Sequence, residues 1–98
     1  MPLFVTLYRF TDQGRKTIKA SPKRVRDVTK MLEKELGVKV LQALYTTGHY
    51  DLVVISEASG DKAALTAAAT IAAAGNVAGE TLHAYTVEQM DRIVSKLP

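Results

Sequence analysis

The sequence contains no cysteine and no tryptophan, and it has only three prolines and six glycines among its 98 residues. The absence of cysteine excludes disulfide bonds, thiolate nucleophiles, iron–sulfur clusters and cysteine-ligated zinc. The small share of proline and glycine, beside a hydrophobic content of 47%, argues against extended disorder. We therefore expect a single folded domain that spans residues 1–98.

Long hydrophobic runs are also missing. The longest small apolar stretch, residues 63–74, is too short and too interrupted by threonine to cross a bilayer. Residues 1–10 have neither the basic start nor the apolar centre of an export signal. These features predict a cytoplasmic protein with no membrane association.

The net charge of +3 conceals an asymmetry along the chain. Residues 15–39 carry nine basic and three acidic side chains, whereas the rest of the chain is net acidic. Such a segment can attract nucleic acid or an acidic protein, although charged helix faces are often simply solvated. Nucleic acid is the less favoured partner, because the predicted strands lack the aromatic pattern of RNA-binding sheets.

The chain is organised around residues 45–57, where a turn leads into an apolar strand. Gly48 can adopt the positive φ that a tight hairpin requires. The predicted strand at 50–55 is apolar on both faces, whereas a half-solvated antiparallel strand alternates apolar and polar residues. This strand is therefore predicted to be central and covered on both sides. The helices of one chain can cover one side, so we expect a homodimer or higher homo-oligomer in which a second copy covers the other.

Further strands and helices are predicted on both sides of this stretch. The predicted strands span residues 3–10, 38–46 and 77–85, and the predicted helices span 21–36, 59–74 and 87–97. Ser21, followed by proline, is the predicted N-cap of the first helix, and Gly37 is its predicted left-handed end. Leu65, Ala68 and Ala72 are predicted to lie on the side of the second helix that faces the sheet.

The order β-α-β-β-α-β followed by a helix predicts an α+β, ferredoxin-like sandwich. Its antiparallel sheet has the expected strand order 4-1-3-2. Strands one and three are then central, and these are the two strands with apolar residues on both faces. Two such sheets packed face to face would form a dimeric α/β barrel.

This topology gathers polar and aromatic side chains at one rim of the sheet, where strand one ends and strands three and four begin. The rim residues are Tyr8, Arg9, His49, Tyr50, Asp51 and Asn76. We interpret them as a binding site for a small metabolite near the subunit interface, in a protein that is not catalytic. No catalytic residue is assigned, because adjacent strand residues point to opposite faces.

Two other interpretations of the rim and the basic segment stay open. The first is a cofactor-independent monooxygenase or isomerase in which His49 or Asp51 transfers a proton, which requires an enclosed pocket of about 300 Å³ or more. The second is a structural module that binds other proteins. Arg9 and Asp51 are predicted to form an ion pair, with an anion clamp by Arg9 as the alternative.

Neither a metal nor a cofactor is predicted. The sequence has no HxH or HExxH pattern, and the predicted topology separates His49 from His83. It also has no glycine-rich phosphate loop.

Four motifs resemble the bacterial GYD-domain family: TDQG at 11–14, IKASPKR at 18–24, GHYDLVV at 48–54 and GNVAGETLHAY at 75–85. Their order and spacing extend the resemblance over nearly the whole chain. The resemblance implies a ferredoxin-like fold of the dimeric α/β barrel type and self-association. It implies no defined function, because the family is uncharacterised.

A more limited likeness involves Thr47, Gly48, Tyr50 and Asp51. These residues are similar to a turn in the effector-binding domain of Lrp/AsnC-type regulators. That likeness implies a small effector, such as an amino acid, bound at a subunit contact. It does not imply DNA binding, because no helix-turn-helix pattern is found among these residues.

Overall fold

The computed structural model describes all of residues 1–98. Its elements are β1 (Leu3–Phe10), α1 (Asp12–Lys16), the 3-10 turn η1 (Ile18–Ala20), α2 (Ser21–Leu36), β2 (Lys39–Tyr45), β3 (Leu52–Glu57), α3 (Asp61–Ala74), β4 (Val77–Ala84) and α4 (Val87–Val94). The strands form one antiparallel sheet in the order β2-β3-β1-β4. This is the predicted ferredoxin-like α+β fold, and it confirms the predicted strand order.

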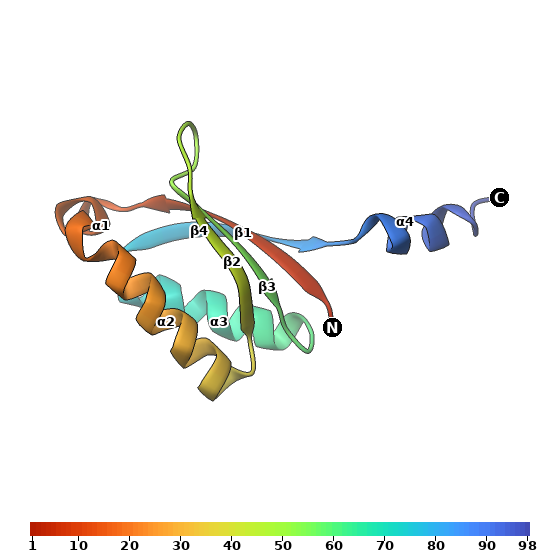
Figure 1. Cartoon of the computed structure of the whole chain (residues 1–98), viewed down its shortest axis with the longest axis horizontal. Coiled ribbons are helices and arrows are strands. Elements are labelled where there is room, and N and C mark those ends of the chain that lie inside the picture. The colour runs from red at the N-terminus through yellow and green to blue at the C-terminus, as the bar shows by residue number, and fades with distance from the viewer.

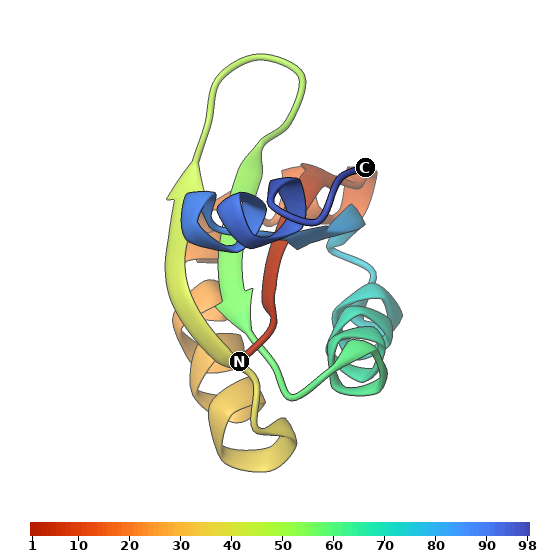
Figure 2. The same cartoon turned by 90° about the vertical axis from the view of Figure 1, so that its right-hand side faces the viewer.

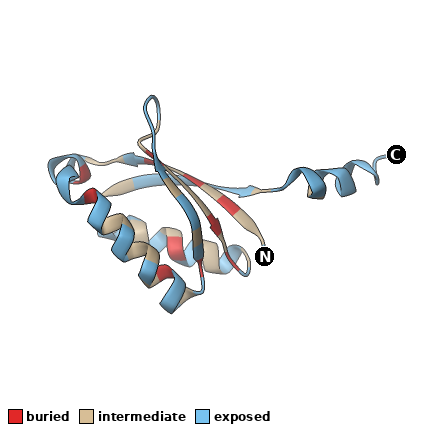
Figure 3. Cartoon of the chain, in the orientation of Figure 1, coloured by how far each residue is buried: buried red, intermediate tan, exposed pale blue.

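The two long helices α2 and α3 lie on the same face of the sheet, which we call the covered face (Figure 1; Figure 2). Alternate residues of β1, namely Phe4, Thr6 and Tyr8, are buried on that face. Phe4 packs in the core with Leu32 of α2 and with Val38, Ala58 and Ala67. Only 11 of the 98 residues are buried, so the core of one chain is thin (Figure 3).

The opposite face of the sheet, which we call the open face, has no helix over it (Figure 1). Val5 of β1 pairs with Ile55 of β3 on one side and with Leu82 of β4 on the other. The register also puts the polar residues Gln42, Glu57 and Glu80 on this face, beside seven large apolar ones: Leu3, Val5, Leu7, Leu44, Val53, Ile55 and Leu82. All seven apolar residues are half-buried or exposed, because they shield one another only from the side.

Residues 46–51 form a loop that rises beyond the end of the sheet (Figure 1). The third strand therefore begins at Leu52 and not at Tyr50 as predicted. The Thr46 N–H donates to the Asp51 carbonyl at 2.9 Å, and the Thr46 hydroxyl donates to the Tyr50 carbonyl at 2.6 Å. Gly48 has the predicted positive φ, at 95°.

The start of α2 differs from the prediction. Ser21 is the first helical residue and not the N-cap, because η1 runs directly into the helix and Ala20 takes the cap position without a side-chain bond. The Ser21 hydroxyl instead lies 2.8 Å from the hydroxyl of Tyr45, which ties α2 to the edge strand β2. Gly37 ends the helix in the predicted left-handed conformation, with φ of 65°.

The prediction for the inner side of α3 is wrong at two of three positions. Leu65 is 69% exposed and Ala72 is exposed, whereas Ala67 is buried and Ile71 packs against the core. The predicted Ala68 is partly buried. In a helix composed largely of alanine, several stripes at spacings of three and four are equally apolar, so periodicity alone does not select the inner one.

The last helix, α4, extends away from the domain beyond the end of β4 (Figure 1). It begins with a capping box in which the Thr86 N–H donates to Oε1 of Gln89 at 2.7 Å, and the Gln89 N–H donates to the Thr86 hydroxyl at 3.1 Å. The large apolar side chains of the helix are exposed, namely Val87, Met90, Ile93 and Val94. Leu97, which follows the helix, is exposed as well. The helix is locally well defined, but no part of its own chain covers its apolar side.

Candidate functional site

Three of the predicted rim residues, Arg9, His49 and Tyr50, contact one another. The Arg9 guanidinium is hydrogen-bonded to Nε2 of His49. It also lies 5.4 Å from the centre of the Tyr50 ring, a distance typical of a cation–π contact. The rings of His49 and Tyr50 meet edge to face, with 5.0 Å between their centres. These contacts hold the Arg9 side chain against the loop.

Asp51 extends the pairing between the first and third strands. Its carboxylate accepts the Phe10 N–H at 2.8 Å, and its own N–H donates to the Tyr8 carbonyl at 2.8 Å. The predicted ion pair between Arg9 and Asp51 is wrong, because the carboxylate is used by the backbone of β1 and the guanidinium by the loop. Asp51 thus has a structural role at the point where the regular strand pairing ends.

Asn76 connects α1 to the start of β4 through hydrogen bonds. Its carbonyl accepts the Thr11 N–H at 3.1 Å, and its Oδ1 accepts from Nε2 of Gln13 at 2.9 Å. The Thr11 hydroxyl donates to the Gly75 carbonyl at 2.6 Å. A Cβ atom at Gly14 would lie 2.0 Å from the Asn76 carbonyl oxygen, so only glycine fits there. The TDQG motif and the Gly75-Asn76 pair are therefore explained by this contact.

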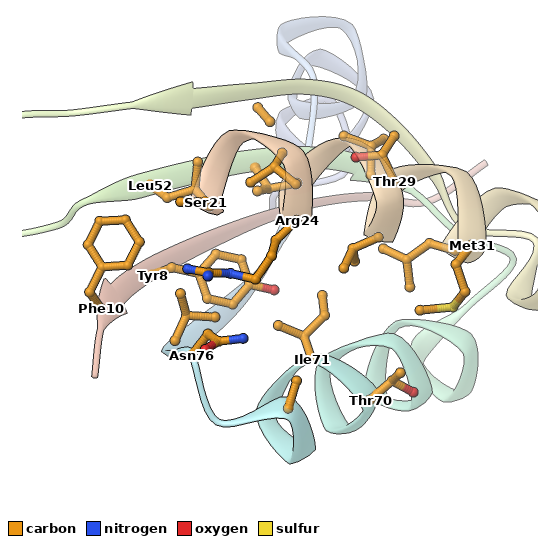
Figure 4. Close-up of a pocket in the computed structure, with 18 residues that line it drawn as sticks. Tyr8, Phe10, Ser21, Arg24, Thr29, Met31, Leu52, Thr70, Ile71 and Asn76 are labelled. Atoms are coloured by element: carbon orange, nitrogen blue, oxygen red, sulfur yellow. The ribbon is translucent and has the colours of Figure 1, made fainter. Parts of the chain in front are cut away.

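A cavity of about 220 Å³ lies between α2, α3 and the covered face (Figure 4). Two predicted rim residues, Tyr8 and Asn76, line it together with aliphatic side chains such as Val28 and Ile71. None of its lining residues is acidic or histidine. Burial raises the pKa of the Tyr8 phenol, and a weaker interaction with Thr6 acts in the opposite direction. The phenol is therefore a protonated hydrogen-bond donor at neutral pH.

The six rim residues thus divide between two places. Tyr8 and Asn76 line the cavity, whereas Arg9, His49 and Tyr50 form the loop cluster, and Asp51 holds the backbone between them. Neither His49 nor Asp51 lines the cavity, so neither could transfer a proton to a molecule held there. The cavity is also smaller and more open than the enclosed pocket that the enzyme interpretation requires.

The basic residue Arg24 lines the cavity and was not predicted as a site residue. Its Nη1 donates to the carbonyl and the hydroxyl of Thr17, at 3.0 and 2.9 Å. Its position could have been inferred, because Val28 and Met31 follow it at i+4 and i+7 on the same side of a helix.

Two further findings concern other classes of site. No group of three or more histidine, aspartate or glutamate side chains lies close enough together to hold a metal ion. None of the helices has the length and apolar character that a membrane span needs.

Comparison with known proteins gives the family of the chain. The profile described as the GYD domain matches residues 4–94. A relative from Thermus thermophilus, described as "Glutamine synthetase and cystathionine beta-lyase binding protein", is 33% identical over 90 residues, which are 92% of this chain and 95% of the relative. No solved structure matches significantly. Since both matches extend over nearly the entire sheet and its helices, the chain belongs to the GYD domain family, as its four motifs predicted.

Proposed function

We propose that this chain is a non-catalytic module that binds other proteins and works as a homo-oligomer. The observation that carries the proposal is the open face of the sheet. Val5, Leu7, Val53 and Ile55 form a continuous apolar surface there, and Leu82 beside them is 43% exposed. Folded monomers rarely leave a large contiguous apolar surface in water unless it is an interaction site.

A second copy of the chain is the occupant that best fits the open face. An apolar sheet surface is self-complementary under a two-fold axis, and two sheets packed face to face bury such surfaces between them. The thin core points the same way, because a chain with 11 buried residues of 98 gains stability from further burial. These features support the dimeric α/β barrel that the sequence predicted.

The helix α4 gives the second copy another contact. The radius of gyration of the chain is 14.7 Å, whereas a compact domain of this length is expected to have about 13 Å. The difference reflects a helix held away from the domain (Figure 1). We propose that its apolar side, which includes Met90, Ile93 and Val94, packs against the partner copy.

The surface left for other proteins in such a dimer is that of α1, η1 and α2 as far as Lys30. Its exposed basic side chains are Arg15, Lys16, Lys19, Lys23, Arg26 and Lys30. Asp27 forms a salt bridge with Lys23 at 2.7 Å, and Asp12 with Arg15. Lys16, Lys19, Arg26 and Lys30 form no salt bridge, although Asp27 lies near enough to Arg26 and Lys30 for their charges to lower its pKa. The name of the relative states that it binds two enzymes. Together, these observations support binding to proteins with an acidic surface.

The experiment is a binding titration with purified glutamine synthetase and cystathionine β-lyase, measured by biolayer interferometry. We expect at least one of them to bind, and we expect the paired change Lys19→Glu and Arg26→Glu to weaken binding by about tenfold or more. The matched control is Lys34→Glu with Lys62→Glu, which makes the same change of charge at other exposed positions. Absence of binding to both enzymes, or equal weakening in the control, would contradict the proposal.

The metabolite site at the rim stays a prediction. The Arg9 guanidinium is bonded to His49 and lies beside the Tyr50 ring, and the Asp51 carboxylate accepts the Phe10 N–H. This arrangement already engages some of the polar groups that a metabolite at the rim would contact. Protein binding is therefore the function that the geometry favours.

A further inference from the structure

We propose that the cavity between α2, α3 and the sheet binds a small apolar carboxylic acid, whose carboxylate is held by Arg24. This site is separate from the open face and from the exposed basic surface. Binding of this ligand therefore depends neither on self-association nor on contact with other proteins.

The size of the cavity sets the size of the ligand. Its volume is about 220 Å³, whereas an apolar cavity of roughly 150 Å³ accommodates benzene, with six non-hydrogen atoms. By proportion, this cavity accommodates about nine non-hydrogen atoms, which is enough for an eight-carbon chain whose carboxylate oxygens lie at Arg24. Most of its wall is aliphatic, with Val28, Met31, Leu32, Val54 and Ile71 among the lining residues. The body of the ligand is therefore apolar and no longer than a medium-length carbon chain.

The charge at the cavity selects an anion. Arg24 is the one charged residue in the lining, and it makes no ion pair within the chain. Thr17 holds its Nη1, so Nη2 and Nε keep N–H donors for a carboxylate, which guanidinium groups bind with two parallel hydrogen bonds. A cation beside an apolar wall disfavours amines and gives no such advantage to alcohols.

Tyr8 and Asn76 add neutral donors at the same cavity, which the hydroxyl side chains of Ser21, Thr29 and Thr70 also line. In Figure 4 the Arg24 side chain reaches from α2 towards the Tyr8 ring and Asn76. The Tyr8 ring lies over Gly79, where a Cβ atom would come within 2.6 Å of it, so glycine at this position leaves room for the ring. The Oδ1 of Asn76 is held by Gln13, which directs the Nδ2 group away from that contact as a donor. Arg24, Tyr8 and Asn76 together offer hydrogen-bond donors, and no acidic side chain lines the cavity to repel an anion.

The test is isothermal titration calorimetry of the whole chain with octanoate, octanol and octylamine. These probes share one apolar tail and differ in their head groups. We expect octanoate to bind about tenfold more tightly than octanol, and we expect no binding of octylamine. Equal binding of octanoate and octanol, or no heat with octanoate, would overturn the proposal.

Two substitutions place the site within the chain. Arg24→Gln is expected to abolish the preference for octanoate over octanol, whereas Arg26→Gln, two residues along and outside the cavity, should keep it. Val28→Phe should fill the cavity and remove binding of both probes. Circular dichroism would verify that each variant is folded. Loss of the preference in Arg26→Gln, or unchanged octanoate binding in Val28→Phe, would place any binding elsewhere and refute the assignment.

Discussion

The covered face and the open face of the sheet have similar apolar content but different surroundings. On the covered face, Phe4 is 3% exposed because α2 and α3 pack over it. On the open face, Val5 is only half-buried, although it follows Phe4 in the same central strand. The difference shows that the apolar pattern of a strand reports how much cover it needs, and not which molecule supplies that cover.

Tyr8 and Arg9, at the end of β1, differ in the same way as Phe4 and Val5. Tyr8 points to the covered side and lines the cavity, whereas Arg9 stays exposed and is satisfied by the loop. The chain has thus covered one face by itself, and we propose that a second copy covers the other. Each prediction below changes one side of this comparison and uses a matched position as its control.

The largest effect is expected on the covered face. Phe4→Ala should lower the free energy of unfolding by about 3–5 kcal/mol, because it removes a buried aromatic ring from a thin core. Urea titration monitored by circular dichroism measures this change. Leu65→Ala, at an exposed position on α3, should change it by less than about 0.5 kcal/mol. Similar losses in the two variants would show that the core is misplaced.

On the open face, Val5→Lys should disrupt association rather than the fold. A lysine at the centre of an apolar interface loses its hydration without gaining a partner. The dissociation constant of the dimer should therefore rise about 100-fold. Sedimentation velocity over a dilution series gives the dissociation constant. Leu65→Lys places the same charge on the helical side and should leave association unchanged. A dimer that tolerates Val5→Lys would place the interface elsewhere.

The end of β1 sharpens the comparison between Arg9 and Asp51. Asp51→Ala should cost about 1–2 kcal/mol of stability, because the Phe10 N–H loses its acceptor. Arg9→Ala should cost less than about 0.5 kcal/mol, since its contacts are exposed. The two urea midpoints would be equal if these residues formed the ion pair that the sequence first suggested.

The contribution of α4 is expected to be smaller. Ile93→Ser should weaken the dimer by about tenfold, because it removes one apolar side chain from a peripheral contact. Glu88→Ser, on the same helix, should have no measurable effect. Sedimentation velocity distinguishes the two variants, and an unchanged dissociation constant for Ile93→Ser would remove α4 from the interface.

The smallest effect concerns the pH dependence of stability through Tyr8. Burial raises the pKa of its phenol in the folded chain, whereas the unfolded phenol ionises near pH 10. The contribution of the Tyr8 phenol to the free energy of unfolding is therefore complete below about pH 10. It is lost as the pH rises through the higher pKa of the folded chain. Urea midpoints at about pH 9 and pH 11 should fall less in Tyr8→Phe than in Tyr85→Phe, which changes an exposed tyrosine. Equal falls would contradict the burial of Tyr8.

The sheet was predictable because its signals are local and strong. Both apolar faces of β1 and β3, the glycine at the hairpin and Gly37 after α2 all predicted their structural positions. The inner side of α3 was not predictable, since its alanine-rich sequence offers several equivalent stripes. Ser21 was misassigned because a 3-10 turn precedes it, and the serine then pairs with Tyr45 from a distant strand.

The candidate site was only partly predictable. Topology placed Arg9, His49 and Tyr50 together, but it could not show that they would satisfy one another or that Asp51 would bind the Phe10 backbone. Arg24 was not predicted, although its spacing of four and seven residues from Val28 and Met31 puts it on the same side of α2 as these lining residues. Whether a side chain is free for a ligand depends on contacts between distant segments, which a pattern of residues does not contain.

The mass of the unmodified chain in solution tests the central claim most directly. Sedimentation equilibrium at low micromolar concentration should give a mass twice the 10.7 kDa of one chain, or a higher multiple. A folded species of 10.7 kDa at that concentration would show that the open face needs no second copy, and it would contradict the account.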